Sequence, residues 1–345
     1  MNGQQHVTFV SHTNKPGGGE LALRRYLEAT TLPVRLVTLE GQGVWAGLSA
    51  DVVEVSGLRG LARAIRGEKL VVANSMRAAF LCATVLPRGT RLVYWVRDGL
   101  ADGAMSELAR TLTKHVTRQK ITHYLANSHY TSASIRQALG VNENAITVVH
   151  SMSGITVHDP PRPRTPPEAP IRLLYLGRIA PWKAPDVAIH ALGELHGMGI
   201  DALLTIAGGA LFGERRYLRH LQTLAKNSPG VSLLGHVPDV TDLLNNHDIL
   251  IHSSILPEPF GQVVIQGLAA GLPVVATNLG GPKEILASSY RLLYRPGDPL
   301  DLAECVRTAL ADYSEVSTWS LNRARAYADE VMLKRTDEVL QALSQ

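Results

Sequence analysis

Residues 256–277 read Leu256-Pro-Glu-Pro-Phe-Gly-Gln-Val-Val-Ile-Gln-Gly-Leu-Ala-Ala-Gly-Leu-Pro-Val-Val-Ala-Thr277. A loop that carries the acid Glu258 leads through Phe260-Gly261 into an apolar helix, which stops at Gly271 before a buried-strand pattern. The start of such a helix presents free backbone N–H groups, where phosphate binds well. Gln266 follows Glu258 by eight residues, about two helical turns, and is expected on nearly the same face. The pattern predicts a site for a ligand that carries phosphate and hydroxyl groups.

Two basic residues follow the first strand expected after residue 170. The stretch Leu176-Gly-Arg-Ile-Ala-Pro-Trp-Lys183 places Arg178 and Lys183 five residues apart at a strand end. A diphosphate carries negative charge that must be balanced, and a charge-assisted hydrogen bond to a fixed cation contributes roughly 1.5–3 kcal/mol. The sequence contains no Asp-x-Asp metal motif, so these two cations are the predicted partners of a diphosphate. Ordinary surface charge at a loop is the alternative.

Three stretches of the chain resemble the motifs of glycosyltransferase family 4, whose members are retaining enzymes of the GT-B fold. Residues 258–266 resemble its E-x7-E motif, with Gln266 in place of the usual second Glu. Residues 177–183 resemble its G-R-x4-K segment, and Gly280-Gly-Pro-Lys-Glu284 resembles its G-G-x-x-E segment. The motifs cover most of residues 171–290 in the family's order and spacing. The resemblance therefore implies a transferase that acts on a nucleotide-diphosphate sugar.

The resemblance also implies roles for residues of the second half. Glu258 is expected to contact the transferred sugar, and backbone N–H groups near Gly261 are expected to face the diphosphate. The family's second Glu accepts both ribose hydroxyls, whereas the amide of Gln266 offers one acceptor oxygen and a donor, which predicts weaker or altered ribose binding. The nucleobase is expected beside His236 and Val237. The donor-binding residues predicted here are Gly177, Gly208, Gly209, His236, Val237, Phe260, Gly261, Gln262, Val263 and Gln266.

The first half holds two further candidate segments. Lys15-Pro-Gly-Gly-Gly-Glu20 lies between a predicted strand and a predicted helix, and its glycines allow a phosphate or sugar to approach the backbone. By resemblance, Gly17, Gly18 and Gly19 join the donor site, and a plain tight turn is the alternative. Tyr94-Trp-Val-Arg-Asp98 ends a strand, where many relatives have His-Asp near the transferred sugar. The predicted catalytic residues are Glu258, Arg178, Lys183, Arg97 and Asp98, with a structural ion pair as the alternative for the last two.

Strand-like and helix-like stretches alternate along both halves, which predicts parallel sheets covered on both faces. Strands are predicted near residues 7–11, 34–37, 70–73, 92–96, 124–127, 172–176, 203–207, 231–234, 249–252, 273–276 and 291–294, and a helix near 106–120. Residues 158–170 contain six prolines and predict an extended linker. The predicted fold is α/β, a GT-B arrangement of two doubly wound Rossmann-like domains that face a central cleft.

The predicted divisions follow from this linker and from the family resemblance. They are an acceptor-binding domain over residues 1–157, the linker over 158–170, a nucleotide-sugar-binding domain over 171–317, and C-terminal helices over 318–345. By resemblance, the last of these helices is expected to cross back to the first domain.

Composition and charge limit the kinds of ligand and the cellular compartment that are expected for the chain. The 345 residues carry a formal net charge of +4 and only 5% aromatic residues. Such a charge suits an anionic ligand or weak contact with anionic lipid heads, whereas so few aromatics give no base-stacking platform for nucleic acid. No run reaches the roughly 18 apolar residues of a membrane helix, and no signal-peptide pattern is visible. With Cys82 and Cys305 as reduced buried thiols, a cytoplasmic protein is expected, at most peripheral at the inner membrane face.

Together these features predict a retaining, metal-independent glycosyltransferase that needs no cofactor. The expected donor is a nucleotide-diphosphate sugar, with a UDP-sugar favoured. The expected acceptor is a glycan, a glycolipid or another lipid-linked molecule, or a small secondary metabolite. Two alternatives remain open: a degenerate nucleotide-sugar-binding protein, favoured by Gln266 and Arg97, and a GT-B epimerase, which would need catalytic groups of its own.

Overall fold

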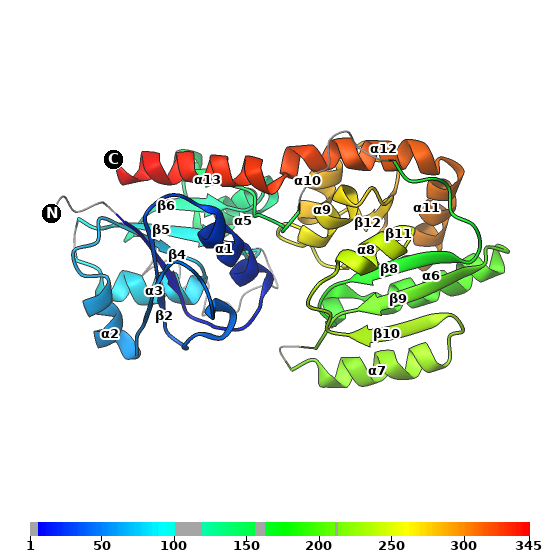
Figure 1. The fold of residues 1–345 in the computed structure, drawn as a ribbon, viewed down its shortest axis with the longest axis horizontal. Coiled ribbons are helices and arrows are strands. Elements are labelled where there is room, and N and C mark those ends of the chain that lie inside the picture. The colour runs from blue at the N-terminus through cyan, green and yellow to red at the C-terminus, as the bar shows by residue number, and fades with distance from the viewer. Residues whose placement is uncertain (1–5, 88, 101–118, 156–162, 211–212) are drawn as a thin grey trace. The chain divides into compact units, whose positions relative to one another are not determined.

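The computed structural model describes residues 6–87, 89–100, 119–155, 163–210 and 213–345. The chain divides into two compact units, of which unit 1 comprises Met1–Gly154 and Asp329–Gln345, and unit 2 comprises Ile155–Ala328 (Figure 1). Each unit is built on one parallel sheet flanked by helices. The predicted α/β class with two doubly wound Rossmann-like domains is therefore confirmed. The helix predicted near 106–120 lies almost entirely outside the described residues.

Unit 1 has a seven-stranded parallel sheet in the order β3-β2-β1-β4-β5-β6-β7. Its strands are β1 (Val7–Ser11), β2 (Val34–Thr38), β3 (Asp51–Glu54), β4 (Leu70–Ala73), β5 (Arg91–Val96), β6 (Ile121–Ala126) and β7 (Ile146–Val148). Its helices are α1 (Gly18–Ala29), α2 (Gly57–Ala64), α3 (Met76–Val85), α5 (His129–Leu139) and α13 (Asp329–Ser344), with short 3-10 turns η1 (Gly43–Trp45) and η3 (Glu143–Ala145).

The central strands of unit 1 are apolar on both sides because helices cover both faces of the sheet. Along β4, Val71 and Ala73 belong to one core, whereas Leu70 and Val72 belong to the other, as the two-residue period of a strand requires. The second core also contains residues of α1 and α13, namely Leu23, Tyr26, Leu27, Met332, Val339 and Leu340.

The last helix, α13, belongs to unit 1 although it follows unit 2 in the sequence. Asp337 accepts hydrogen bonds from the hydroxyls of Tyr26 at 2.7 Å and Thr30 at 2.8 Å. At the start of the helix, the carboxylate of Asp329 accepts the backbone N–H groups of Ser153 at 2.8 Å and Gly154 at 3.0 Å. These polar contacts and the shared core fix α13 on the sheet of unit 1.

Unit 2 has a six-stranded parallel sheet in the order β10-β9-β8-β11-β12-β13. Its strands are β8 (Ile171–Leu176), β9 (Ala202–Ala207), β10 (Val231–Gly235), β11 (Ile249–His252), β12 (Val274–Thr277) and β13 (Leu293–Tyr294). Its helices are α6 (Pro185–Gly197), α7 (Arg215–Lys226), α8 (Thr241–Asn246), α9 (Gln262–Ala269), α10 (Gly280–Leu286), α11 (Pro299–Ala311) and α12 (Tyr313–Ala324), with 3-10 turns η4 (Pro181–Lys183) and η5 (Arg325–Tyr327). The sheet reverses its strand order between β8 and β11, the point where Rossmann-type sheets place their ligands.

Part of the predicted linker packs on unit 2. Arg164 donates to the carbonyl oxygens of Leu244 at 2.7 Å, His247 at 2.8 Å and Ala270 at 2.8 Å, which lie in the last turn of α8, directly after α8 and directly after α9. Its own backbone N–H donates to Ser317 Oγ at 2.8 Å. A cation at helix C-termini also interacts favourably with their dipoles. Residues 163–170 are thus held on unit 2, and residues 158–162 lie outside the described part.

Candidate functional site

The loop that carries Glu258 joins β11 to α9 at the carboxyl end of the unit 2 sheet. Helix α9 begins at Gln262, after Gly261 with a left-handed φ of 108°. The Gly281 N–H donates to the Glu258 carbonyl oxygen over 2.8 Å. A Cβ on Gly280 would lie 2.4 Å from the same oxygen, so this close approach requires glycine. The Gly280-Gly281 pair therefore fixes the backbone of the loop.

Three donors converge on one oxygen of the Glu258 carboxylate. Lys183 Nζ lies 2.5 Å from Oε2 and His252 Nε2 lies 2.6 Å from it. Ser254 Oγ lies 3.4 Å from the same atom. The Glu258 side chain is 15% exposed, and no hydrogen bond or ion pair joins its other oxygen, Oε1, to any residue that the structure describes. One oxygen is anchored and the other is unengaged.

The electrostatics keep Glu258 ionised. Burial alone would raise its pKa, but the charge of Lys183 and the hydrogen bond from His252 outweigh burial and hold the pKa well below the ordinary value of 4.5. An ionised carboxylate with one unengaged oxygen accepts hydrogen bonds and donates none. The site can therefore receive hydroxyl groups at Oε1.

Arg178 and Lys183 both lie near the ring of Trp182 in the segment that follows β8. The guanidinium carbon of Arg178 lies 5.6 Å from the ring centroid, and Lys183 Nζ lies 4.7 Å from it. At these distances the face of an aromatic ring attracts a cation. Arg178 Nε also lies 3.4 Å from Glu214 Oε1. The Trp182 carbonyl accepts the N–H of Ile255 at 2.8 Å, so this segment is tied to the Glu258 loop.

The predicted glycines of unit 2 stand at the ends of β8 and β9. A Cβ on Gly208 would lie 1.7 Å from the carbonyl oxygen of Gly177, so only glycine permits these two strand ends to meet. Gly209 accepts a backbone hydrogen bond of 3.0 Å from the segment after Gly177. His236 is exposed and Val237 is half-buried after β10. The glycines thus have a structural role of their own, independent of any ligand.

The residues predicted around the start of α9 fall into two groups. The Phe260 side chain is 3% exposed and lies in the core, so only its backbone can face a ligand. Gln262 and Val263 occupy the first turn of α9, and Gln266 the second; all three are half-buried. Glu258 lies in the loop before α9, which begins at Gln262 as the pattern of loop and helix predicts, and the common face expected for Glu258 and Gln266 stays a prediction.

Arg97 follows β5 of unit 1 and is buried. Its Nε donates to Asn74 Oδ1 at 2.8 Å, and its Nη1 donates to Ser151 Oγ at 2.8 Å. Its guanidinium carbon lies 4.0 Å from the centroid of the Trp95 ring. A Cβ on Gly19 would lie 2.9 Å from Arg97 Cδ, so the start of α1 covers this side chain. Burial lowers the pKa of Arg97, and the nearby acids of unit 1 oppose that shift.

The other unit 1 candidates surround the same side chain. Gly17 precedes α1 and lies under the carboxylate of Glu20, since a Cβ on Gly17 would lie 2.5 Å from Glu20 Oε2. Burial raises the pKa of Glu20, and the charge of Arg97 opposes this rise. Gly18 and Asp98 are exposed. The structure thus brings Gly19 against Arg97 and Gly17 against Glu20, both at the start of α1 in unit 1.

This geometry, a carboxylate loop beside two cations at a Rossmann switch point, agrees with the comparison of sequences. Residues 160–327 match the family model described as glycosyl transferases group 1. The matched segment contains Arg178, Lys183, Glu258 and Gln266 and nearly all of unit 2.

The curated relatives of the chain include glycosyltransferases. A putative glycosyltransferase, YtcC of Bacillus subtilis, is 27% identical over 202 residues, which are 57% of this chain and 46% of that protein. The glycogen synthase of Mycobacterium tuberculosis is 31% identical over 231 residues, which are 62% of this chain and 51% of that protein. The chain thus spans about half the length of each of these relatives.

A solved structure extends the likeness to the whole fold. Anabaena Alr3699/HepE, crystallised in complex with UDP-glucose, superimposes with a TM-score of 0.85 and 21% identity over 98% of this chain and 99% of that one. The likeness shows that the chain has the fold of the GT-B glycosyltransferases, with its two parallel-sheet Rossmann-like units.

Sequence reasoning missed two residues of the site in the segment that matches group 1. His252 and Ser254 reach the Glu258 carboxylate, and Ser254 Oγ also lies 3.1 Å from His252 Nε2. His252 is the last residue of β11, a position from which side chains at a carboxyl edge reach a ligand site. That position was the available signal, since no motif points to either residue.

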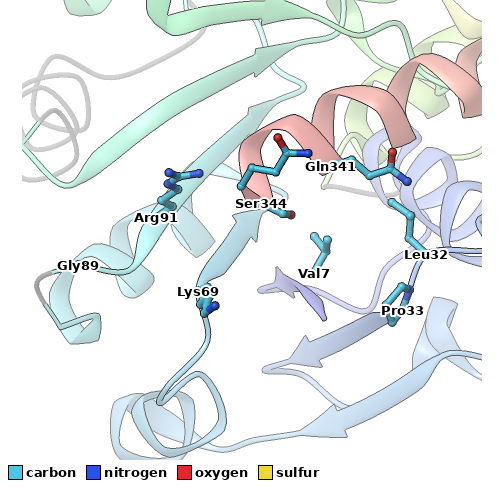
Figure 2. A pocket seen from close by; sticks show the side chains of 9 residues that line it. Val7, Leu32, Pro33, Lys69, Gly89, Arg91, Gln341 and Ser344 are labelled. Atoms are coloured by element: carbon cyan, nitrogen blue, oxygen red, sulfur yellow. The ribbon is translucent and has the colours of Figure 1, made fainter. Parts of the chain in front are cut away.

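A cavity among the described residues lies away from these site residues. It has a volume of about 500 Å³ and lies where β1, β4 and β5 of unit 1 begin, with Val7, Lys69, Arg91 and Gln341 among its lining residues (Figure 2). Arg91 also donates to the Leu343 carbonyl at 2.7 Å. The predicted site residues stand at the opposite, carboxyl edges of the sheets, so this cavity is not the predicted site.

None of the described helices is long and apolar enough to cross a membrane.

Proposed function

We propose that the chain is a retaining, family 4-like glycosyltransferase that moves a sugar from a UDP-sugar without a metal ion or cofactor. Unit 2 would bind the donor, and unit 1 would bind a glycan, glycolipid or secondary-metabolite acceptor. The proposed reaction takes place in the cytoplasm, and the protein makes at most peripheral contact with the inner face of the membrane. The free thiols Cys82 and Cys305, both buried, are compatible with that compartment.

The observation that carries the proposal is the contact between Lys183 and Glu258. It sets a cation suited to phosphate beside a carboxylate suited to sugar hydroxyls, and a second cation, Arg178, contacts the ring of Trp182 as Lys183 does. A nucleotide-diphosphate sugar presents these two chemistries side by side. Two fixed cations can balance the charge that develops on the departing diphosphate, which is the task that a metal ion performs in other sites.

The proposed reaction breaks the bond between the anomeric carbon of the sugar and the diphosphate oxygen. A new bond forms from the anomeric carbon to the acceptor oxygen on the same face, and the acceptor proton passes to the departing phosphate. Glu258 binds the sugar in this scheme and forms no bond to it. The preference for UDP rests on Alr3699/HepE, whose crystals contain UDP-glucose, and retention rests on the resemblance of residues 258–266 to the family motif.

The test is turnover of nucleotide sugars in the presence of EDTA. The protein is incubated with the glucose conjugates of UDP, GDP, TDP and ADP, and proton NMR follows the nucleotide and the first anomer of glucose released. Slow release of UDP together with α-glucose is expected, since UDP-glucose is an α-glycoside. First release of β-glucose would refute retention, and turnover that disappears with EDTA would refute the metal-free mechanism.

Gln266 favours a second candidate, a degenerate nucleotide-sugar-binding protein. Its amide supplies one acceptor oxygen where the family supplies two, and this departure from the family motif favours a site that has lost its activity. Binding of UDP-glucose with no turnover, even with oligosaccharide and lipid acceptors added, would support this candidate over the transferase.

A further inference from the structure

His252 lies beneath the carboxylate of Glu258, and no motif or comparison assigns it a role. Its side chain is 3% exposed, and its Nε2 lies 2.6 Å from Glu258 Oε2. We infer that His252, with Ser254, is a positioning residue that holds Oε2 of Glu258 so that Oε1 faces the donor sugar. The inference rests on the proposed function, in which Glu258 binds sugar hydroxyls.

The tautomer of His252 follows from its surroundings. Nδ1 is buried and has no hydrogen-bond partner among the described residues. A proton on Nδ1 would be a buried donor without an acceptor, which is unfavourable. The tautomer with its proton on Nε2 avoids this cost and donates a hydrogen bond to Glu258. The imidazole therefore acts as a hydrogen-bond donor to the carboxylate.

The backbone of His252 is fixed by the sheet. Residue 252 ends β11 and pairs in register with Ala276 of β12, and its carbonyl accepts the hydroxyl of Tyr294 at 3.4 Å. Lys183, the third donor to Oε2, carries its charge on a flexible four-carbon stem with rotatable donors. The two donors differ in this respect, because the His252 ring is 3% exposed at a fixed strand end, whereas the ammonium of Lys183 lies at the end of a flexible stem.

This difference implies two states of the site, one without a donor and one with a donor bound, and His252 keeps its place in both. Without a donor, Lys183 neutralises Glu258. When a diphosphate arrives, Lys183 turns to the phosphate, and His252 and Ser254 keep Oε2 in place. The unengaged Oε1 then accepts a sugar hydroxyl in an orientation set before binding, which lowers the ordering cost of binding. His252 thus contributes to binding of the sugar and leaves binding of the nucleotide to other groups.

The binding experiment compares UDP with UDP-glucose by calorimetry for three variants. His252→Leu removes the donor, and His252→Gln keeps an N–H close to the position of Nε2. His247→Leu is the matched control, a buried histidine of unit 2 that bonds Leu243 and Thr205 instead. We expect H252L to raise the Kd of UDP-glucose roughly ten-fold or more, the loss of one charge-assisted hydrogen bond, and to change the Kd of UDP less than about three-fold.

We expect the affinity of H252Q for UDP-glucose to lie within about three-fold of that of the wild type. We expect H247L to leave the ratio of the Kd values of UDP and UDP-glucose unchanged. An unchanged ratio in H252L, or equal losses of both ligands, would overturn the role of His252. Failure of H252Q to restore affinity would do the same.

A second experiment needs no ligand. Thermal unfolding of E258Q, H252L and the double variant measures whether the two side chains act together. The expected loss in Tm for the double variant is clearly smaller than the sum of the single losses, and additive losses would overturn the inference. If the wild type binds neither UDP nor UDP-glucose, the proposed function falls, and this thermal cycle still decides whether His252 holds Glu258.

Discussion

Lys183 Nζ and Glu258 Oε2 are 2.5 Å apart, so the cation expected to hold the donor's phosphate is paired with the carboxylate expected to hold its sugar. Both side chains are largely buried, with 11% and 15% exposure. Removing one partner of such a pair leaves the other as an uncompensated charge in a poorly hydrated place. The pair therefore links the stability of the empty site to its selectivity for ligands.

Substitution of Glu258 should separate sugar binding from nucleotide binding. In Glu258→Gln, Lys183 loses its partner and becomes available to phosphate, so the affinity for UDP should stay the same or rise by up to about three-fold. The affinity for UDP-glucose should fall roughly ten-fold or more, and transfer should be abolished, because the charged acceptor of the sugar hydroxyl is gone. Calorimetry with both ligands checks this. Equal losses of the two affinities would show that Glu258 does not bind the sugar.

The stability difference between the wild type and E258Q should depend on pH. The pKa of Glu258 is held below its ordinary value of 4.5, so its ionised form stabilises the fold above that pH, and this contribution is lost as the pH falls toward the lowered pKa. At low pH the protonated Glu258 resembles Gln. The deficit in Tm of E258Q should therefore be largest near pH 7 and shrink below pH 4.5. Thermal unfolding from pH 7 to pH 3 measures it, and a constant deficit would contradict the assignment.

Gly208→Ala should destabilise unit 2 strongly. The new methyl would lie 1.7 Å from the Gly177 carbonyl oxygen, a backbone atom that cannot yield without shifting the end of β8. We expect a loss of about 3 kcal/mol or more in the free energy of unfolding. Gly193→Ala is the matched control, since Gly193 lies in α6 with nothing within 4 Å of a new Cβ. That change should stabilise the protein by roughly 0.5–1 kcal/mol. Denaturation curves that place both variants at wild-type stability would refute the close contact.

Arg97→Lys should lower stability even though it keeps the charge. The guanidinium of Arg97 reaches Asn74 and Ser151 at once, and a lysine ammonium cannot reproduce this planar fork. We expect a loss of roughly 2–4 kcal/mol, and the exposed control Arg66→Lys should change stability by less than about 0.5 kcal/mol. If R97K keeps its Tm but loses transfer, the role of Arg97 in the reaction is chemical, as its place in the sequence predicts.

Gln266→Glu should tighten binding of UDP. A carboxylate offers two acceptor oxygens to the ribose hydroxyls, whereas the amide of Gln266 offers one. Gln262→Glu provides the comparison, because it makes the same change in charge one turn earlier in α9, near the expected diphosphate, and should weaken binding. The Kd of UDP for both variants is the measurement. A Kd that is unchanged in Q266E would argue against the ribose assignment.

The sequence was sufficient for most of the fold and less so for the site. All the strands predicted for unit 2 are present, because buried parallel strands are continuous apolar runs. In unit 1, β3 and β7 were not predicted; they are short edge strands, and Asp51 and Glu54 at the ends of β3 are exposed. The C-terminal division also differed, since α12 begins at Tyr313 and belongs to unit 2.

Within the site, the sequence predicted that Lys183 and Glu258 serve one ligand, and the structure shows them in contact. It could not predict His252, because the contact of this residue with Glu258 depends on how the loop returns over the end of β11. Periodicity describes helices and strands but not the path of a loop.

The place of α13 has a consequence for biosynthesis. Unit 2 occupies one continuous stretch of chain, whereas unit 1 is interrupted by it and is completed by α13. When the ribosome has translated residue 328, all of unit 2 has been made, yet Tyr26 still lacks Asp337 and the core of unit 1 still lacks Leu340. Domains generally fold in the order of their synthesis. Unit 2 begins later in the sequence, yet it is the first unit whose residues have all been synthesised. Unit 1 begins earlier and can complete its fold only after α13 has been synthesised.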